Sequence, residues 1–528
     1  MKPSYYRDKW IALRIATADK HALSELARRV ADSFMDHYYQ DGHYEKGYID
    51  LLCEMATSFE KARSNGVVSS IFFSSIVEAL CDDYEDFQFE IYARLMAQVV
   101  SYCRDLPAGS ELNKHLNRFH LVSADDIMKR ACGIHTRIRS FDVRDNAVRK
   151  IFILSRITVG ADVAIVSVIV QRLARIFPEA QIIIMGSLKL KEIFGGNPRL
   201  RIRELRYERR GGLLERLASW RSVLDVLAEE TATGRSNTTL LVDPDSRISQ
   251  LGILPLIEGE DYLYFNSHSS LPSADSSCMA ELANRWMDKV FGPSDFCYPR
   301  VWQEPGVLVR AMKLKESLLR SGCRRITTVN FGVGGNPRKR LSLAFEKKLI
   351  CELLKEPDTV VVLDKGFGAE EAANSQKITE QLMSEGHQVR HAASGCPEPV
   401  GFAHGILAVE CTIGEISALI SVSDEFIGYD SACQHIAAAL AVPTITIFAG
   451  SNNPRFVQRW SACGDTACKI VHVNTLVGSQ GIDPDGIVDR VMDERTQSQR
   501  LKTGSEPRVR DLSTSRPVRP RSEQTVKD

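Results

Sequence analysis

The sequence predicts an α/β fold in which two tandem series of parallel strands and helices follow an all-helical N-terminal region. Three observations favour this fold. Apolar residues spaced three and four apart dominate residues 1 to about 145, as is typical of amphipathic helices. Short apolar runs alternate with helical stretches from Lys150 onward. A second alternation of the same kind begins near Arg324.

Composition excludes several classes of protein. The 528 residues include 67 Lys plus Arg and 67 Asp plus Glu, and 44% are hydrophobic. Such a chain can bury full-sized cores and is not disordered throughout. Its zero net charge argues against a dedicated nucleic-acid binder. We expect no transmembrane span and no secretory signal, and the 13 Cys, none in a C-x-x-C pair, indicate reduced thiols in a cytoplasmic protein.

Residues 1–145 are expected to form a separate helical domain. Ser123 is followed three residues later by Asp126, a capping-box pattern that predicts the start of a short helix. The acidic run Cys81–Asp86 is interpreted as a solvated loop, with a binding role as the alternative. Helical periodicity covers Ala22–Tyr39, Val67–Leu80 and Phe87–Leu106.

The first α/β series occupies residues 150–305. It opens at Lys150 with KIFILSRI, a run typical of a buried parallel strand. A helix over Asp162–Phe177 and a strand over Gln181–Met185 complete a βαβ unit, whose crossover should be right-handed. Further strands are predicted at Thr239–Val242 and Tyr262–Phe265, and further helices at Leu213–Leu227 and Ser277–Val290.

The second series occupies residues 306–494. RITTVNFG, near Arg324, predicts a strand that ends in a Gly-rich loop, and a helix over Glu304–Arg320 precedes it. The remaining predicted strands are Thr359–Leu363, Glu425–Tyr429 and Pro443–Phe448, and the remaining helices are Ser342–Lys355, Glu370–Ser384 and Ser431–Leu440.

A disordered basic tail is predicted over residues 495–528. This segment has no aromatic residue and is rich in Arg, Ser, Thr and Pro. A solvated tail is one interpretation, and weak attachment to anionic lipid or nucleic acid is the other.

Candidate ligand-binding residues lie in loops after predicted strands, because ligands of parallel α/β sheets bind at the carboxyl ends of the strands. RITVGAD ends at Asp162, which is either a helix cap or a catalytic carboxylate. NFGVGGNPRKR combines glycines with cations that suit a phosphate, although a flexible surface turn has a similar composition. In DKGFGAEE, Glu370 or Glu371 could bind ribose hydroxyls or begin a helix.

The fourth loop is the most informative and belongs to YDSACQHIAAALAVPTITIF, which starts at Tyr429. Asp430 and Ser431 end a strand and begin a helix whose N-terminal amides can hold a diphosphate. His435 lies one turn further along, on the face of Ser431. A single His is more often structural, but the complete string D-S-x-x-x-H-x-A-A-A-L-x-x-P favours a functional site.

This string resembles the donor-site signature of the heptosyltransferase-like glycosyltransferases of family 9, whose members have the GT-B fold. The resemblance extends over about residues 150–474 and includes the segments RITVGADVAIVSVIVQRLARIFPEAQI, VDPDSRISQLGILP, NFGVGGNPRKRLSLAF and GFGAEE. It implies two Rossmann-like domains that face a cleft, an acceptor domain at 150–305 and a donor domain at 306–494. Residues 1–145 and the tail lie outside it.

The resemblance also implies roles for single residues. Asp162 matches the acidic residue proposed in the family as the base for the acceptor hydroxyl. Lys339 matches the phosphate-binding Lys, and Glu370 matches the ribose-binding Glu, with Glu371 as the alternative. The family string D-[ST]-G-x-x-H is matched by Asp430, Ser431 and His435.

The implied reaction is inverting, metal-independent transfer of a heptose-like sugar from a nucleotide-diphosphate sugar, such as ADP-heptose, to a hydroxyl acceptor, as in lipopolysaccharide or glycan biosynthesis. We expect no cofactor and no metal site; the DPD turns at 243–245 and 483–485, and His387 with His391, are weak metal candidates. The implied partners are a nucleotide-sugar donor and a glycan, lipid-linked or protein acceptor. Peripheral membrane contact through the tail is a further expectation, and no specific nucleic acid is expected.

An alternative function comes from a different class of protein. The chain would then be a catalytically weak GT-B module that binds a nucleotide or glycan and uses the helical domain as an interaction surface. Two departures from the family pattern favour it: G-A-D stands where G-D is usual, and Ala432 stands where Gly is usual. In a third departure, Leu341 replaces a common aromatic residue. A GT-B nucleotide-sugar epimerase is disfavoured by the D-S-x-x-x-H string.

Overall fold

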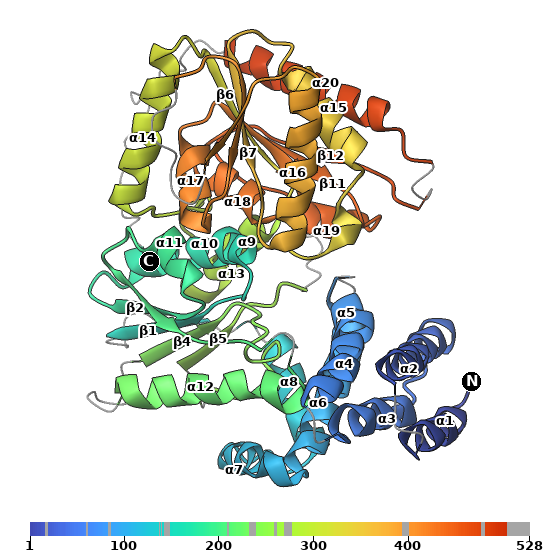
Figure 1. The fold of residues 1–528 in the computed structure, drawn as a ribbon. Helices are drawn as coiled ribbons and strands as arrows, with labels where there is room; N and C mark the ends of the chain where they lie inside the picture. Colours follow the sequence, from blue (N-terminus) through green and yellow to red (C-terminus); the bar gives the residue numbers. More distant parts are fainter. Residues whose placement is uncertain are drawn as a thin grey trace, which may run out of the picture.

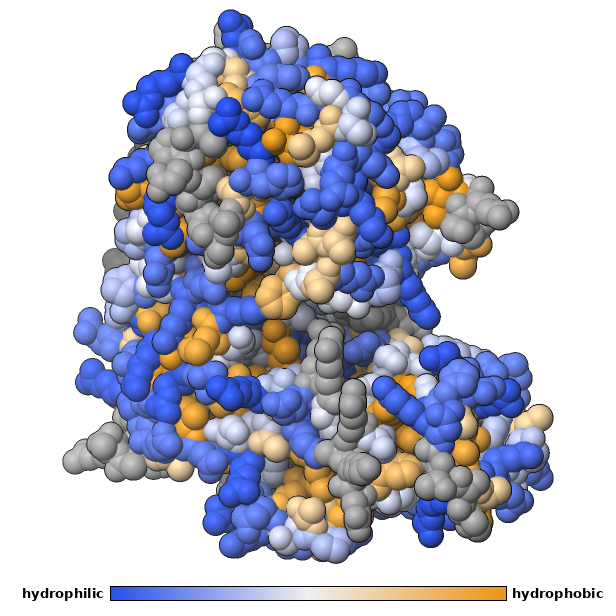
Figure 2. Space-filling model, in the orientation of Figure 1, coloured by the Kyte–Doolittle hydropathy of each residue, from blue (hydrophilic) through white to orange (hydrophobic). Residues whose placement is uncertain are grey.

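The computed structural model places the helical region, a first parallel sheet and a second parallel sheet one after another (Figure 1). The predicted α/β fold, with two Rossmann-like parallel sheets after an all-helical region, is confirmed. In space-filling view the outline is indented between the second α/β domain and the helical region (Figure 2). The structure describes residues 1–15, 19–59, 62–82, 86–136, 138, 140–141, 148–208, 211–231, 239–257, 261–268, 277–392, 401–476 and 481–503.

The helical region contains the predicted helices and several that the periodicity did not reveal. The capping box at Ser123 is confirmed: its backbone N–H donates to Asp126 Oδ2 at 2.9 Å, and the Asp126 N–H donates to Ser123 Oγ at 3.2 Å. Of the acidic run, residues 83–85 lie outside the described residues. The elements are α1 (Pro3–Ile15), α2 (Lys20–Asp41), α3 (Lys46–Thr57), α4 (Ala62–Phe72), a π-helical turn η1 (Phe73–Val77), α5 (Glu78–Asp82), α6 (Asp86–Arg104), η2 (Pro107–Gly109), α7 (Ser110–Arg118) and α8 (Ala124–Thr136).

The first sheet has five parallel strands in the order β3-β2-β1-β4-β5. The four predicted strands are present, and β3 is an additional edge strand whose alternating Arg side chains hid it from a search for apolar runs. The elements are β1 (Lys150–Leu154), α9 (Val159–Ala161), η3 (Asp162–Val166), α10 (Ser167–Ile176), β2 (Gln181–Gly186), α11 (Lys189–Phe194), β3 (Leu200–Glu204), α12 (Leu213–Thr231), β4 (Thr239–Asp243), β5 (Tyr262–Tyr264) and α13 (Met279–Phe291).

The second sheet has seven strands in the order β12-β11-β10-β6-β7-β9-β8. The predicted strands form its centre, and β8 and β12 lie at its edges. The elements are α14 (Pro305–Arg320), β6 (Arg325–Asn330), η6 (Pro337–Lys339), α15 (Leu343–Leu353), β7 (Thr359–Asp364), α16 (Ala369–Ser384), β8 (Val389–Ala392), β9 (Gly405–Val409), α17 (Ile413–Ser421), β10 (Glu425–Tyr429), α18 (Ala432–Ala439), β11 (Thr444–Phe448), α19 (Pro454–Arg459), β12 (Cys468–His472) and α20 (Pro484–Thr503).

Alternate side chains of the first sheet enter two different cores, as the two-residue period of a strand requires. Phe152 and Leu154 of β1 belong to a core that also contains α12 and the helices of residues 1–136. Ile151 and Ile153 belong to a second core that continues across α10, α13, α17 and α18 into the second sheet. Figure 1 shows the same layering, with α12 beneath the first sheet and α9–α11 above it.

The helical region therefore shares a core with the first sheet, contrary to the expectation of a separate folding unit. The described helices α4, η1 and α5 include one stretch, Ser64–Cys81, that is long and apolar enough to cross a membrane by composition alone. In the structure its side chains Phe72, Ile76 and Leu80 are buried in the shared core. Its apolar character is explained by this packing.

A fragment of residues 1–145 is accordingly expected to aggregate or to unfold without a cooperative transition, because the side chains that pack on the sheet become exposed. Circular dichroism during heating, with gel filtration of the fragment beside the full chain, measures this. A soluble fragment with a cooperative melt would show that the helices form a sufficient core without the sheet.

The tail begins later than predicted. Helix α20 continues to Thr503, and Arg495 is buried, with ion pairs from Nη2 to Glu356 Oε2 at 2.6 Å and to Glu425 Oε1 at 2.8 Å. Both carboxylates are distant from Arg495 in sequence, so local composition does not reveal these ion pairs. For this reason the sequence predicted that the tail begins at Arg495. Residues 504–528 lie outside the described residues, and the other domain boundaries stay predictions.

Candidate functional site

Each sheet has a point at which its strand order reverses, and ligands of such sheets bind there, beyond the carboxyl ends of the strands. In the first sheet this point lies between β1 and β4, and in the second between β6 and β10. The loops after β1 and β10 meet in the structure, because α9 packs against α18. The predicted site residues from the two domains therefore lie at one junction.

Lys339 ends the 3-10 turn η6, in the loop after β6. Its Nζ lies 2.5 Å from Asp430 Oδ2, at the end of β10, and 5.4 Å from the ring centroid of Phe456. The next residue, Arg340, instead forms an ion pair with the buried Glu346, whose Oε1 also accepts a hydrogen bond from the Tyr429 hydroxyl. Arg340 thus anchors the loop, and Lys339 is the cation that faces the site.

The loops after β6, β7 and β10 are joined by Asn330. Its Nδ2 donates to Asp364 Oδ2 at 2.6 Å, and its Oδ1 accepts from the Ser431 hydroxyl at 3.4 Å. Burial raises the pKa of Asp364 to about 6. Ser431 is the N-cap residue of α18, but its side chain forms no capping bond with the helix. The first turn of α18 is thus left uncapped by Ser431, as an anion site at a helix N-terminus requires.

The structure distinguishes between the two adjacent glutamates at the start of α16. Glu371 accepts backbone N–H bonds from Val333 at 2.8 Å and from Phe367 at 2.7 Å, so it braces the two Gly-rich loops. Glu370 is exposed. Glu370 is therefore the carboxylate available to a ligand, in agreement with its predicted role, which itself stays a prediction.

His435 lies one turn into α18 and is 5% exposed. Burial lowers its pKa to about 4, so the ring is neutral at pH 7. Its ring centroid lies 6.1 Å from that of Trp460. A Cβ built on Gly160 of the first domain would lie 3.1 Å from His435 Cδ2 and 3.1 Å from Ala432 Cα. Gly160 thus permits the close approach of α9 to the start of α18.

Gly160→Val is expected to destabilise this junction by roughly 1–3 kcal/mol, because the added methyl groups overpack a closed contact. The measurement is chemical denaturation of the full chain. The matched control is Gly306→Val, since a Cβ at Gly306 meets no atom within 4 Å. Equal stability of the two variants would show that the domains are not held in this arrangement in solution.

Asp162, the predicted catalytic residue, is only 1% exposed. Its Oδ2 accepts from the Ser155 hydroxyl at 2.7 Å, and its Oδ1 accepts the backbone N–H of Arg156, also at 2.7 Å. Burial raises the pKa of Asp162 to about 7, although both hydrogen bonds and the charge of Arg156 oppose the shift. Asp162 therefore has a pKa suited to a general base near neutral pH.

The backbone around Asp162 is irregular. Asp162 begins the π-helical turn η3, and such turns hold one residue more than an α-helical turn. The longer π turn thus gives room for the one residue that G-A-D has in addition to the usual G-D. Ile157, in the loop that precedes the helix, has a φ of 77°, a strained conformation for a β-branched residue. Strain of this kind clusters at functional sites.

Sequence reasoning missed several residues of this junction. Asn330, Arg156 and Trp460 lie within or beside the loops that it singled out, but nothing in their local sequence distinguishes them from ordinary loop residues. The DPD turn at 243–245 was interpreted as a weak metal candidate. Both of its Asp side chains are buried, and they are engaged by Tyr262, Tyr264 and Arg156.

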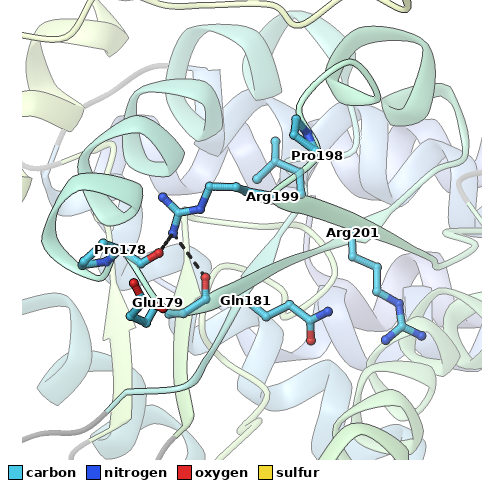
Figure 3. A pocket seen from close by; sticks show the side chains of 8 residues that line it. Pro178, Glu179, Gln181, Pro198, Arg199 and Arg201 are labelled. Atoms are coloured by element: carbon cyan, nitrogen blue, oxygen red, sulfur yellow. Dashed lines mark hydrogen bonds between the residues drawn. The ribbon is translucent and has the colours of Figure 1, made fainter.

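Two other features of the described residues lie away from the junction. Ligand atoms of Cys351, Glu385 and His387 lie within 4.8 Å of one another and could hold a metal ion, although Lys347 pairs with Glu385. A shallow pocket lies near the amino ends of β2 and β3 (Figure 3). There the Arg199 guanidinium donates to the carbonyls of Ala174 and Pro178, so its charge caps a helix end.

Comparison with known proteins identifies part of this chain. The family model of glycosyltransferase family 9, the heptosyltransferases, matches residues 378–472. We call these matched residues the family 9 segment. They contain Asp430, Ser431 and His435, so the resemblance implied by the D-S-x-x-x-H string is confirmed at the start of α18.

The chain also has a curated relative. Over 73 residues the chain is 42% identical to lipopolysaccharide heptosyltransferase 3 of Escherichia coli, a stretch that is 14% of this chain and 20% of the relative. The match thus spans about a fifth of the relative's length.

Two solved structures are similar to part of this chain. A family 9 glycosyl transferase from Veillonella parvula has 15% identity and a TM-score of 0.46, with 67% of this chain and 96% of that chain covered. The ADP-heptose LPS heptosyltransferase II of E. coli has 16% identity and a TM-score of 0.42, with 66% and 99% covered.

Proposed function

We propose that this chain is a glycosyltransferase that moves a heptose-like sugar from a nucleotide-diphosphate sugar, such as ADP-heptose, to a hydroxyl of a glycan, lipid-linked or protein acceptor. One observation carries the proposal: the family 9 segment places Asp430, Ser431 and His435 at the reversal point of the second sheet, against the Asp162 helix of the first. The cytoplasmic location expected from the sequence belongs to the same proposal.

On the donor side, three groups have distinct tasks. Glu370 binds the ribose hydroxyls. Lys339 and the first amides of α18 bind the diphosphate and stabilise the charge that develops on it as it leaves. This cation and these amides can do the work of a metal ion, so we propose a metal-independent reaction. Transfer measured with EDTA present should then equal transfer without it, and restoration by a divalent cation after EDTA would refute this part.

On the acceptor side, Asp162 is the general base. The acceptor oxygen attacks the anomeric carbon from the face opposite the diphosphate, and its proton moves to Asp162 as the O–H bond breaks. The bond between the anomeric carbon and the diphosphate oxygen breaks at the same time. Attack from the opposite face inverts the anomeric centre. Because Asp162 is covered in this structure, the base role requires the strained loop around Ile157 to move.

The alternative, a catalytically weak module that binds a nucleotide or glycan, is favoured by the burial of Asp162. Release of nucleoside diphosphate from a panel of donor sugars, in the presence of candidate acceptors, distinguishes the two functions. Turnover supports the transferase. Tight binding of a donor without release of diphosphate, with every acceptor class present, supports the binding module.

A further inference from the structure

We propose that Arg156 forms a subsite for an oxyanion of the acceptor, a carboxylate or phosphate near the attacked hydroxyl. This inference rests on the proposed transferase function. Arg156 directly follows Ser155 after β1, and its partner Asp245 follows β4. The two residues therefore occupy the reversal point of the first sheet, where ligands of such sheets bind.

Arg156 lies in a cluster of polar and charged side chains around the buried Asp245. Its Nη1 lies 3.0 Å from Asp245 Oδ2, and His268 Nδ1 lies 3.2 Å from the same oxygen. Asp245 also accepts hydrogen bonds from the hydroxyls of Ser267 and Tyr264. Burial alone would raise the pKa of Asp245, but the charges of His268 and Arg156 hold it well below its usual range.

Both nitrogens of the His268 ring face acceptors. Nε2 lies 2.9 Å from the backbone carbonyl oxygen of Cys81 in the helical region, and Nδ1 faces the Asp245 carboxylate. The Ser267 hydroxyl also lies 3.4 Å from Nδ1. Asp245 is thus shared by Arg156 and His268. His268 is a positioning residue that also ties this cluster to the helical region.

Part of the Arg156 guanidinium remains available. Its Nη1 donates to Pro244 O, Asp245 Oδ2 and Ser267 Oγ, whereas Nε and Nη2 have no hydrogen-bond partner among the residues that the structure describes. The side chain is 12% exposed, so these donors are held in place without being sealed from solvent. Two unused donors on a planar cation suit a carboxylate or phosphate, which can accept both.

The location favours the acceptor over the donor. The guanidinium carbon lies 5.9 Å from the ring centroid of Trp460, which itself lies 6.1 Å from the ring centroid of His435. The donor side has its own cation in Lys339. The Arg156 backbone N–H, in contrast, bonds the proposed base Asp162. An anion on Arg156 would therefore hold the acceptor beside its base.

The test is calorimetric titration of inorganic phosphate into the full chain at low ionic strength. Arg156→Gln is expected to weaken phosphate binding roughly ten- to a hundredfold, the effect of losing one charge-assisted contact. Arg156→Lys keeps the charge and should keep part of the affinity. His268→Gln removes the imidazole that contacts both Asp245 and the Cys81 carbonyl, and it should weaken binding severalfold. The matched control is Arg324→Gln, an exposed Arg paired with Asp358 and distant from the junction.

Lys339→Ala separates the two sources of an anion. Loss of binding in Arg156→Gln with retention in Lys339→Ala supports an acceptor subsite. Equal loss in both variants would mean that the donor diphosphate bridges the domains, and it would overturn the acceptor assignment. Full retention in Arg156→Gln, or no binding by the unaltered chain at millimolar phosphate, would overturn the subsite itself. None of these measurements depends on sugar transfer. Failure of the anion subsite can therefore be distinguished from failure of the proposed transferase function.

Discussion

Asp162→Asn is expected to lower the rate of sugar transfer by ~10²–10⁴-fold, the usual cost of losing a general base. Asn keeps the size of the side chain, and its oxygen can still accept one of the two hydrogen bonds now made by Ser155 and the Arg156 amide. Donor affinity should hardly change, because Asp162 belongs to the acceptor side. The measurement is turnover and donor affinity in the same variant, once a donor–acceptor pair is known.

The pKa of Asp162 is raised to about 7, and from this we predict how the transfer rate and the stability depend on pH. Transfer by the unaltered chain should increase with pH up to about 7, because only the carboxylate accepts a proton. Stability should show the opposite trend. The folded pKa lies above the unfolded value of 3.8, so the folded state binds more protons between these values, and this group's contribution to stability decreases as pH rises through that window. Asp162→Asn should remove this pH dependence and leave the protein at least as stable above pH 7.

The control for both effects is Glu229→Gln, in the same domain, which removes an exposed carboxylate paired with Arg203. It should leave the pH profile of transfer unaltered. Near-normal turnover of Asp162→Asn would make Asp162 a structural residue of the π turn and would leave the base unidentified.

Lys339→Ala should weaken nucleotide-sugar affinity roughly ten- to a hundredfold, because it removes a charge-assisted contact to the diphosphate. The variant also leaves the buried Asp430 without its cation, so some loss of stability is expected, although Asp430 Oδ1 still accepts from Gln434 Nε2 at 2.6 Å. Calorimetry with a nucleoside diphosphate measures the effect.

Two neighbours of Lys339 serve as controls. Arg338 is exposed, and Arg338→Ala should have little effect on affinity. Arg340→Ala should instead destabilise the fold, because it leaves the buried Glu346 without its cation. If Lys339→Ala bound nucleotide normally and Arg338→Ala did not, the phosphates would lie elsewhere in the loop.

The sequence by itself determined the central strands, the order of the elements and the donor string. Each of these is encoded locally: a buried parallel strand is a short apolar run, and a helix start has a recognisable cap such as Ser123 with Asp126. The edge strand β3 was missed because its alternating Arg pattern resembles exposed loop, and the interior strand β9 was missed although all of its residues are buried. The loops that contain Asp162, Lys339 and Glu370 were singled out because each follows a strand and has a suitable composition, whereas the roles of these single residues came from the family resemblance.

Only the tertiary structure decided which of these groups are held together and which are covered. Glu370 and Glu371 are adjacent in sequence, yet only Glu371 is used to brace the loops. Arg156, Asp245 and His268 lie far apart in the chain and meet only because β1 and β4 are neighbours and β5 follows. The helical region shares a core with the first sheet because β1 presents alternate side chains to it. Partners of this kind are set by long-range strand order and packing, on which local periodicity and composition carry no information.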